Sequence, residues 1–207
     1  MLIVNNIYFN RDMSIILKDI NLSLSPKKII HLTGNNGAGK TTLLKILTNI
    51  IKPDNGDIFW NGKNIKKSHF DYFKNLTFIM DKNTSNSELT IKENILFWRK
   101  IFSSFVSDKV INSMLELLAL SKYQNTLANN LSNGELKKLE LSRLIIEQKK
   151  LWILDEPYLG LDKNSIELIN QTFISHCNSG GMIIFSSHIN PDISNLEIIN
   201  LEKHENI

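Results

Sequence analysis

Short apolar runs alternate along the chain with longer amphipathic stretches. The runs have the length of buried strands, whereas the stretches repeat their apolar positions at the helical period. The expected strands are Leu2–Ile7, Leu17–Leu24, Ile29–Leu32, Asp57–Trp60, Leu76–Met80, Leu151–Leu154, Met182–Phe185 and Leu196–Leu201. The expected helices are Thr41–Asn49, Ile91–Phe102, Asp108–Leu120, Glu135–Gln148 and Asn164–Cys177. Such alternation predicts an α/β fold.

The expected helices are unevenly distributed. A polar, loop-like segment, residues 81–87, follows one strand, and helical periodicity then dominates up to about residue 135. We therefore expect a helical subdomain, residues 82–135, inserted into an α/β core of residues 1–81 and 136–207. A length of 207 residues is compatible with one domain that carries such an insertion.

A phosphate-binding loop stands between one expected strand and the helix that follows it. The segment 34–41 matches the pattern G-x-x-x-x-G-K-[ST] in the strand-to-helix context that the pattern requires. Its glycines allow backbone N–H groups to converge on an anion, and the helix dipole favours negative charge at the same point. We expect Lys40 to contact the β- and γ-phosphates and the Thr41 hydroxyl to ligate Mg²⁺. The candidate nucleotide-binding residues of this loop are Gly34, Asn35, Asn36, Gly37, Ala38, Gly39, Lys40, Thr41 and Thr42.

Two carboxylates end another buried strand. The apolar run Leu151–Leu154 leads directly into Asp155, Glu156 and Pro157. Because α/β sheets bind ligands at the carboxyl ends of their parallel strands, this pair is placed for chemistry on the bound phosphates. We expect Asp155 to hold Mg²⁺, through water, and Glu156 to orient or deprotonate the attacking water.

The segment Leu131-Ser132-Asn133-Gly134-Glu135 precedes the helix before the acidic strand. Taken alone, Ser132 followed three residues later by Glu135 predicts a capping box. At this point the chain resembles the ABC ATPases, whose signature L-S-G-G-Q occupies this place. The resemblance implies that Ser132 and the Gly134 amide bind the γ-phosphate held by a second copy, so that two copies close around two ATP molecules.

Two further segments extend the resemblance to nearly the whole chain. Leu159-Gly160-Leu161-Asp162 resembles the D-loop of the family, and Ser186-Ser187-His188 resembles its switch region. The resemblance implies that His188 contacts the γ-phosphate. It also implies a RecA-like P-loop NTPase core with an inserted helical subdomain, ATP hydrolysis, and ATP and Mg²⁺ as ligands.

The chain departs from the family after the expected strand Leu76–Met80. Family members place a glutamine there that ligates Mg²⁺ and links the core to the helical subdomain, whereas this chain has Asp81, Lys82 and Asn83. Lysine cannot ligate Mg²⁺, although it could neutralise phosphate charge, and Asn83 could partly substitute. This departure puts the rate of hydrolysis in question rather than nucleotide binding.

The sequence leaves several candidates for the residue that stacks on adenine. Asn10 and Arg11 occupy the positions at which the family places its adenine-stacking aromatic residue, and Tyr8 and Phe9 are adjacent to them. Arg11 could itself stack on the base, while either aromatic residue could simply belong to the core of the first strand.

Composition narrows the class of protein. The net charge of +3 does not indicate a nucleic-acid surface, and the single Cys177 excludes an internal disulfide framework. We find no apolar run near the ~20 residues of a membrane span, and no signal peptide is expected. The 30 Ile, 26 Asn and 21 Lys against 3 Arg are typical of an AT-rich genome.

Details of the chain resemble the ATPase subunits of cytochrome c maturation, notably Trp152 before the acidic pair and the compact helical segment. This resemblance implies a motor for haem export or release of a haem-loaded chaperone, without direct haem binding. It implies integral membrane partners of the CcmB and CcmC type and a peripheral location, on the matrix face of a mitochondrial inner membrane or the cytoplasmic face of a bacterial one. The alternatives are a non-transport ABC ATPase, or a regulatory subunit that hydrolyses ATP poorly because of Lys82.

Overall fold

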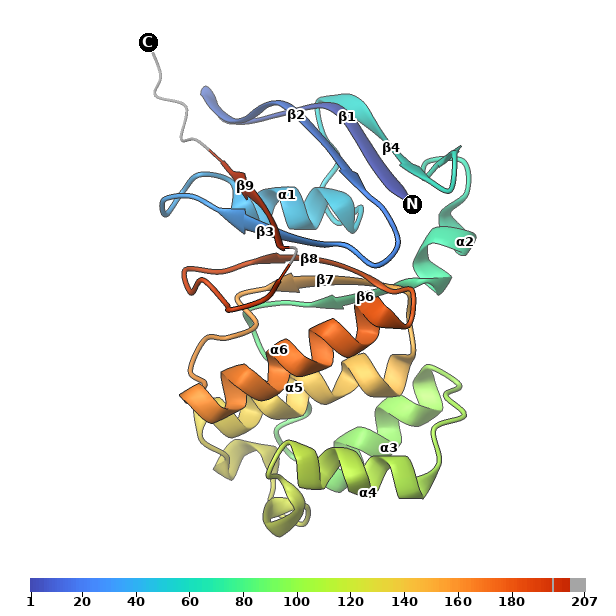
Figure 1. Cartoon of the computed structure of the whole chain (residues 1–207), viewed down its shortest axis with the longest axis vertical. Coiled ribbons are helices and arrows are strands. Elements are labelled where there is room, and N and C mark those ends of the chain that lie inside the picture. The colour runs from blue at the N-terminus through green and yellow to red at the C-terminus, as the bar shows by residue number, and fades with distance from the viewer. Residues whose placement is uncertain (195, 202–207) are drawn as a thin grey trace.

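The computed structural model describes residues 1–194 and 196–201. Two sheets and two groups of helices form its layers (Figure 1). The first sheet is antiparallel, with the order β2-β1-β4-β5, and its strands are β1 (Leu2–Arg11), β2 (Ser14–Leu24), β4 (Asn55–Trp60) and β5 (Lys63–Asn64). The first two strands are longer than the predicted ones, and none of the added residues, 8–11 and 14–16, is fully buried.

The second sheet is parallel and lies at the centre of the molecule. Its order is β6-β7-β8-β3-β9, and its strands are β3 (Ile29–Thr33), β6 (Leu76–Ile79), β7 (Leu151–Asp155), β8 (Met182–Ser186) and β9 (Leu196–Asn200). The carboxyl ends of β3, β7 and β8 therefore lie side by side, with Asp155 opposite Ser186. The α/β fold predicted from the sequence is confirmed.

Alternate residues of the central strands belong to two different cores. In β7, Leu151 and Ile153 face the core that contains helix α1 (Lys40–Leu47) and the antiparallel sheet. Trp152 and Leu154 face the opposite core, which contains the remaining long helices. Period-two alternation in a strand buried on both faces produces this division.

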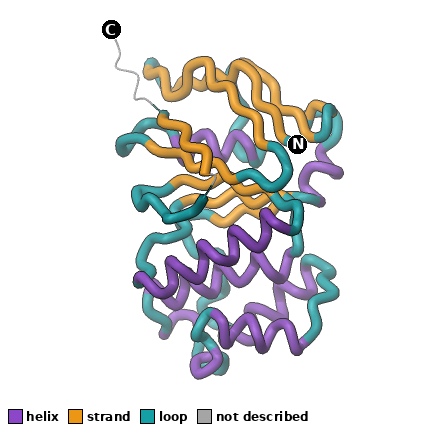
Figure 2. The backbone as a smooth tube through the Cα atoms, viewed as in Figure 1, coloured by secondary structure: helices purple, strands orange, loops and turns teal. Residues whose placement is uncertain are grey.

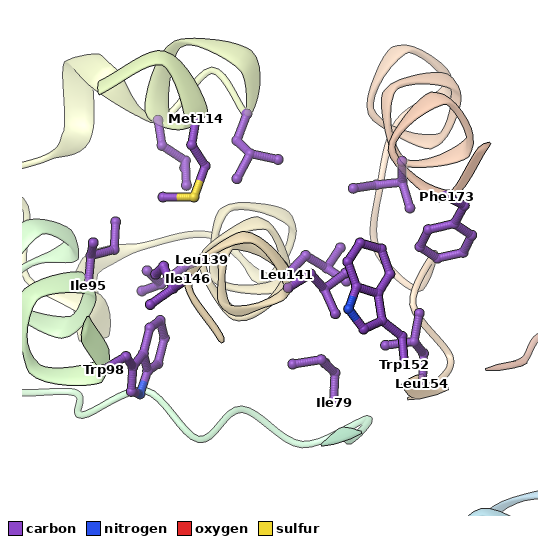
Figure 3. Close-up of a cluster of buried hydrophobic side chains, with 14 of the residues drawn as sticks. Ile79, Ile95, Trp98, Met114, Leu139, Leu141, Ile146, Trp152, Leu154 and Phe173 are labelled. Carbon is purple, nitrogen blue, oxygen red and sulfur yellow. The ribbon is translucent and has the colours of Figure 1, made fainter. Parts of the chain in front are cut away.

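Helix α5 (Asn133–Glu147) lies within the second core, as Figure 3 shows. Ile95, Trp98 and Met114 approach it on one side, from α3 (Ile91–Ile101) and α4 (Asp108–Leu117). On its other side lie Trp152 of β7 and Phe173 of α6 (Lys163–Asn178). Because α5 is covered on two sides, much of its surface is buried, including charged positions.

Figure 2 shows most of the helices gathered at one end of the molecule and the strands at the other, with α1 lying among the strands. The five predicted helices are all present, with ends shifted by up to three residues. Short elements went unpredicted: β5, α2 (His69–Lys74) and the 3₁₀ turns Ser121–Tyr123 and Ala128–Asn130. They are too short to display a hydrophobic period, and only Tyr72 of α2 is buried. Within the described residues, no helix is both long and apolar enough to cross a membrane.

Candidate nucleotide-binding site

The loop between β3 and α1 forms one wall of a pocket of about 410 Å³. Six candidate residues from the sequence line it together with Glu156 and His188, which follow β7 and β8. Arg11 and Ile16 complete the lining from the antiparallel sheet. The lining residues are Arg11, Ile16, Asn36, Gly37, Gly39, Lys40, Thr41, Thr42, Glu156 and His188.

Gly39 is required where the loop turns into the helix. It occupies the left-handed region with φ 90° and stands at the N-cap of α1. A Cβ atom there would lie 2.7 Å from Leu17 Cδ2 and 3.0 Å from the Ile16 carbonyl oxygen. Glycine therefore permits both the backbone angle and the close approach of the loop to β2.

Lys40 begins α1 and is almost completely buried. Its ammonium group donates hydrogen bonds to the carbonyl oxygens of Gly34, at 2.6 Å, and Asn35, at 3.2 Å. The side chain thus lies over the loop, with its charge at the pocket where the helix dipole is also positive.

Thr41, Asp155 and Ser186 form a polar contact between three elements. The Thr41 hydroxyl lies 3.1 Å from Asp155 Oδ1, and the Ser186 hydroxyl donates to the same oxygen at 2.6 Å. Asp155 is buried. A hydroxyl and a carboxylate oxygen at this separation are hard donors that suit Mg²⁺, so the residues present fit the ion.

Glu156 has a strained backbone, with φ 47°. Its N–H group lies 3.1 Å from the Ser186 carbonyl oxygen and 3.2 Å from the Ser186 hydroxyl, contacts that hold the turn after β7. The Glu156 carboxylate lies 3.6 Å from His188 Nε2. A left-handed conformation at a non-glycine residue costs on the order of 1 kcal/mol.

His31 lies near the site but belongs to no motif in the sequence. It is fully buried in β3, stacks on Phe185, and its Nε2 lies 3.0 Å from the carbonyl oxygen of Ser187. Because a carbonyl only accepts, Nε2 carries the proton, and burial lowers the pKa of His31. The neutral imidazole thereby holds the residue directly before His188. A histidine within an apolar run was the signal available in the sequence.

Of the three candidates for adenine stacking, Arg11 lines the pocket. Phe9 packs against the apolar core, and the Tyr8 carbonyl oxygen accepts a hydrogen bond from Asp54 N–H. Neither aromatic residue is among the residues that line the pocket in the described part of the chain. Ile16 offers an apolar surface there that the sequence pattern did not reveal.

Ser132 and Gly134 lie apart from the pocket. The predicted capping box is present: Ser132 Oγ accepts from Glu135 N–H, and the Glu135 carboxylate accepts from Ser132 N–H at 2.8 Å. A Cβ atom on Gly134 would lie 2.8 Å from the Gly160 carbonyl oxygen, so the start of α5 packs closely on the segment after β7. Asp162 in that segment caps α6 by accepting from Ser165 N–H.

The chain matches the family model described as ABC transporter over residues 17–159. It is 37% identical to the protein named cytochrome c biogenesis ATP-binding export protein CcmA of Reclinomonas americana, over 93% of this chain and 86% of that protein. The identically named protein of Aliivibrio fischeri is 32% identical, over 91% of this chain and 92% of that protein.

Solved structures show the same fold. A putative ABC transporter ATP-binding protein from Pyrococcus furiosus has a TM-score of 0.84 at 21% identity and covers 97% of this chain and 96% of its own. An ATP-binding cassette described as a dimer in a post-hydrolysis state, bound to ADP and Pi, has a TM-score of 0.79 at 21% identity, over 99% of this chain and 97% of its own. Both the sequence and the fold therefore lead to one conclusion: the chain belongs to the ABC transporter family and is an ABC ATPase.

Proposed function

We propose that this chain is the ATP-hydrolysing motor subunit of a membrane complex in cytochrome c maturation. The observation that carries the proposal is the convergence of Lys40, Thr41, Glu156 and His188 on one pocket, with Asp155 directly behind Thr41. The names of the relatives above supply the pathway.

The residues have distinct proposed roles in hydrolysis. The loop amides and Lys40 bind the β- and γ-phosphates, and Thr42 adds a further hydroxyl. Glu156 orients the attacking water and accepts its proton, while His188 stabilises charge on the γ-phosphoryl group. Thr41 and Asp155 would hold Mg²⁺, which would supply positive charge to neutralise the phosphates.

A second copy of the chain completes each site in this proposal. Ser132 and Gly134 do not line their own pocket, and Ser132 is exposed at the start of α5. An exposed helix N-terminus binds anions, so this end suits the γ-phosphate held by a partner copy. We propose a dimer that closes on two ATP molecules and opens after hydrolysis, moving the helical subdomain, residues 82–135, relative to the core.

The proposed partners are integral membrane subunits of the CcmB and CcmC type. Of the apolar residues around α3, Ile95 and Trp98 are buried, while Phe97 and Ile101 lie one turn apart and are about half exposed. These two exposed side chains are our candidate contact with a membrane subunit. The proposed location is the matrix face of a mitochondrial inner membrane or the cytoplasmic face of a bacterial one, and haem itself would bind elsewhere in the complex.

The decisive experiment replaces the proposed base. Glu156→Gln should bind ATP like wild type, lose turnover by about 10³-fold and accumulate as an ATP-bound dimer in size-exclusion chromatography. Affinity purification of the tagged full chain from its own membranes should retain integral membrane subunits. Hydrolysis at the wild-type rate in Glu156→Gln would overturn the assignment of the base.

A second candidate function follows from Lys82. Its side chain is exposed on the loop after β6 and supplies no oxygen ligand. A nucleotide-binding regulatory subunit with slow hydrolysis would have such a residue, and a rise in kcat in Lys82→Gln would support it.

A further inference from the structure

Helix α5 buries charged side chains that an amphipathic helix would normally expose. Lys137, Glu140 and Glu147 are each at least nine-tenths buried. Burying an unpaired charge is costly, so each must have partners within the protein. The partners of two of these residues belong to the loop that follows β6, and this arrangement gives the loop a fixed position.

Glu140 holds the far part of the loop. Its Oε1 accepts hydrogen bonds from the backbone N–H groups of Thr84, at 2.5 Å, and Ser85, at 2.6 Å, and its Oε2 accepts from the Thr84 hydroxyl at 2.8 Å. Three hydrogen bonds to one buried carboxylate fix the backbone as well as a side chain. A local interaction within the loop would not attach it to the helix in this way.

Arg143, one turn further along α5, reinforces the same contact. Its guanidinium donates to the Thr84 hydroxyl at 3.0 Å and lies 3.6 Å from Glu140. It also lies over the rings of Trp98 and Phe102, at 5.7 and 5.8 Å from their centroids. The loop is thus connected through α5 to α3 and the residue after it.

Lys137 meets the near end of the loop. Its ammonium lies 3.5 Å from the Met80 carbonyl oxygen and interacts electrostatically with the carboxylates of Asp81, Asp155 and Glu156. Met80 follows Ile79, which pairs with Leu154, so the loop begins level with Asp155. The exposed residues 81–83 therefore span two points of attachment to α5, beside the catalytic carboxylates.

We propose that Glu140 is a positioning residue for ATP hydrolysis, which holds residues 81–83 at the edge of the sheet next to Asp155 and Glu156. The inference rests on the proposed function, because it assigns the loop a place in the hydrolytic site. Glu140 acts through Thr84 and Ser85 and does not itself touch the nucleotide.

Glu147 offers a matched control. It is a buried carboxylate on the same helix and pairs with the same Arg143, at 2.8 Å, but it accepts from the Thr77 hydroxyl in strand β6 instead of from the loop. Glu140→Ala and Glu147→Ala therefore each remove a buried carboxylate from α5. The first loses the contact with the loop, and the second loses the contact with β6. Glu140→Gln keeps an oxygen for the two backbone N–H groups and serves if the alanine variant does not fold.

The test measures ATP turnover, apparent KM and amide hydrogen exchange on the full chain, together with any membrane subunits that co-purify. We expect Glu140→Ala to lower kcat about tenfold with KM changed by less than about twofold, since misplacing a positioning group affects the chemical step. The amides of Thr84 and Ser85 should exchange faster. Glu147→Ala should alter stability but leave kcat and the exchange of these two amides near the wild-type values. Glu140→Gln should give values between those of wild type and Glu140→Ala.

Equal loss of kcat in the two alanine variants, or unchanged exchange at Thr84 and Ser85, would overturn the proposal. Failure of the proposed function is a separate outcome. It would appear as a wild-type chain that neither binds nor hydrolyses ATP, and the exchange experiment would still decide whether Glu140 holds the loop.

Discussion

The imidazole of His176 lies flat against the indole of Trp152, with ring centroids 3.5 Å apart and 6° between the ring planes. Nε2 of His176 lies 3.2 Å from the Lys150 carbonyl oxygen and so carries the proton. A Cβ atom on Gly181 would clash with that nitrogen. The histidine near the end of α6 thus fits closely between the start of β7 and the start of β8.

This arrangement predicts a loss of stability in acid. Burial lowers the pKa of His176 from 6.5 to about 4, so the unfolded chain takes up the proton more readily than the folded one. Between pH 6.5 and about pH 4, the free energy of unfolding should fall as the pH falls. Well above pH 6.5, His176 should not contribute to the pH dependence of that free energy. Urea unfolding at about pH 5 and pH 7.5 measures the difference.

The control is His176→Phe, which keeps a ring against Trp152 but cannot titrate. The free energy of unfolding of this variant should depend less on pH than that of wild type. Part of the pH dependence that remains should come from His31, whose pKa is also lowered by burial. An unchanged pH dependence in His176→Phe would contradict the assignment.

A pair of glycine substitutions tests the phosphate loop. Gly37 and Gly39 both have positive φ, 86° and 90°, but a Cβ atom on Gly37 meets nothing within 4 Å, whereas one on Gly39 meets Leu17 and Ile16. Each alanine variant should therefore lose about 1 kcal/mol to backbone strain. Gly39→Ala should lose a further 1–3 kcal/mol, on the order of an overpacked core, in urea unfolding. If both alanine variants lose the same free energy of unfolding, the close approach of Gly39 to β2 does not contribute to stability.

Replacement of Lys82 tests how the loop after β6 affects hydrolysis. Lys82→Gln introduces an amide oxygen that can ligate Mg²⁺, so kcat should rise, on the order of tenfold, with nucleotide affinity nearly unchanged. Lys82→Ala removes the charge without adding an oxygen and should not reproduce the gain. If Lys82→Gln has the same kcat as wild type, the hypothesis that Lys82 slows hydrolysis is contradicted.

Arg11 is the candidate that stacks on adenine, since it alone of the three candidates lines the pocket. Arg11→Ala should weaken ATP binding about tenfold, the size of a partly desolvated cation–π contact, while Tyr8→Ala should have little effect. Binding of inorganic triphosphate serves as the control, because it lacks the base. Equal weakening of both ligands by Arg11→Ala would indicate a contact with phosphate instead.

Much of the site was predictable because its chemistry is local. The glycines, Lys40 and Thr41 occupy one continuous segment between a strand and a helix, and Asp155 with Glu156 ends a single apolar run. The capping box of Ser132 and Glu135 spans four residues and formed as expected. In each case neighbours along the chain make the contact, so spacing alone is informative.

Other features depended on contacts between distant segments. The sequence left Arg11 as one of three candidates for stacking on adenine, and nothing in it placed Ile16 in the pocket or His31 against Ser187. The burial of Glu140 could not be read from α5 either, because its hydrophobic pattern is weak for a helix covered on two sides.

The amino-acid sequence by itself determined the alternation of strands and helices, the family and the candidate residues for binding phosphate, because each follows from short-range periodicity or from a motif. The tertiary structure decided which side chains meet. The order of strands in the central sheet brings Thr41 against Asp155 and His188 near Glu156, and the burial of α5 attaches the loop after β6 to Glu140. These contacts join residues that are far apart along the chain, and only packing of the sheet and helices selects them.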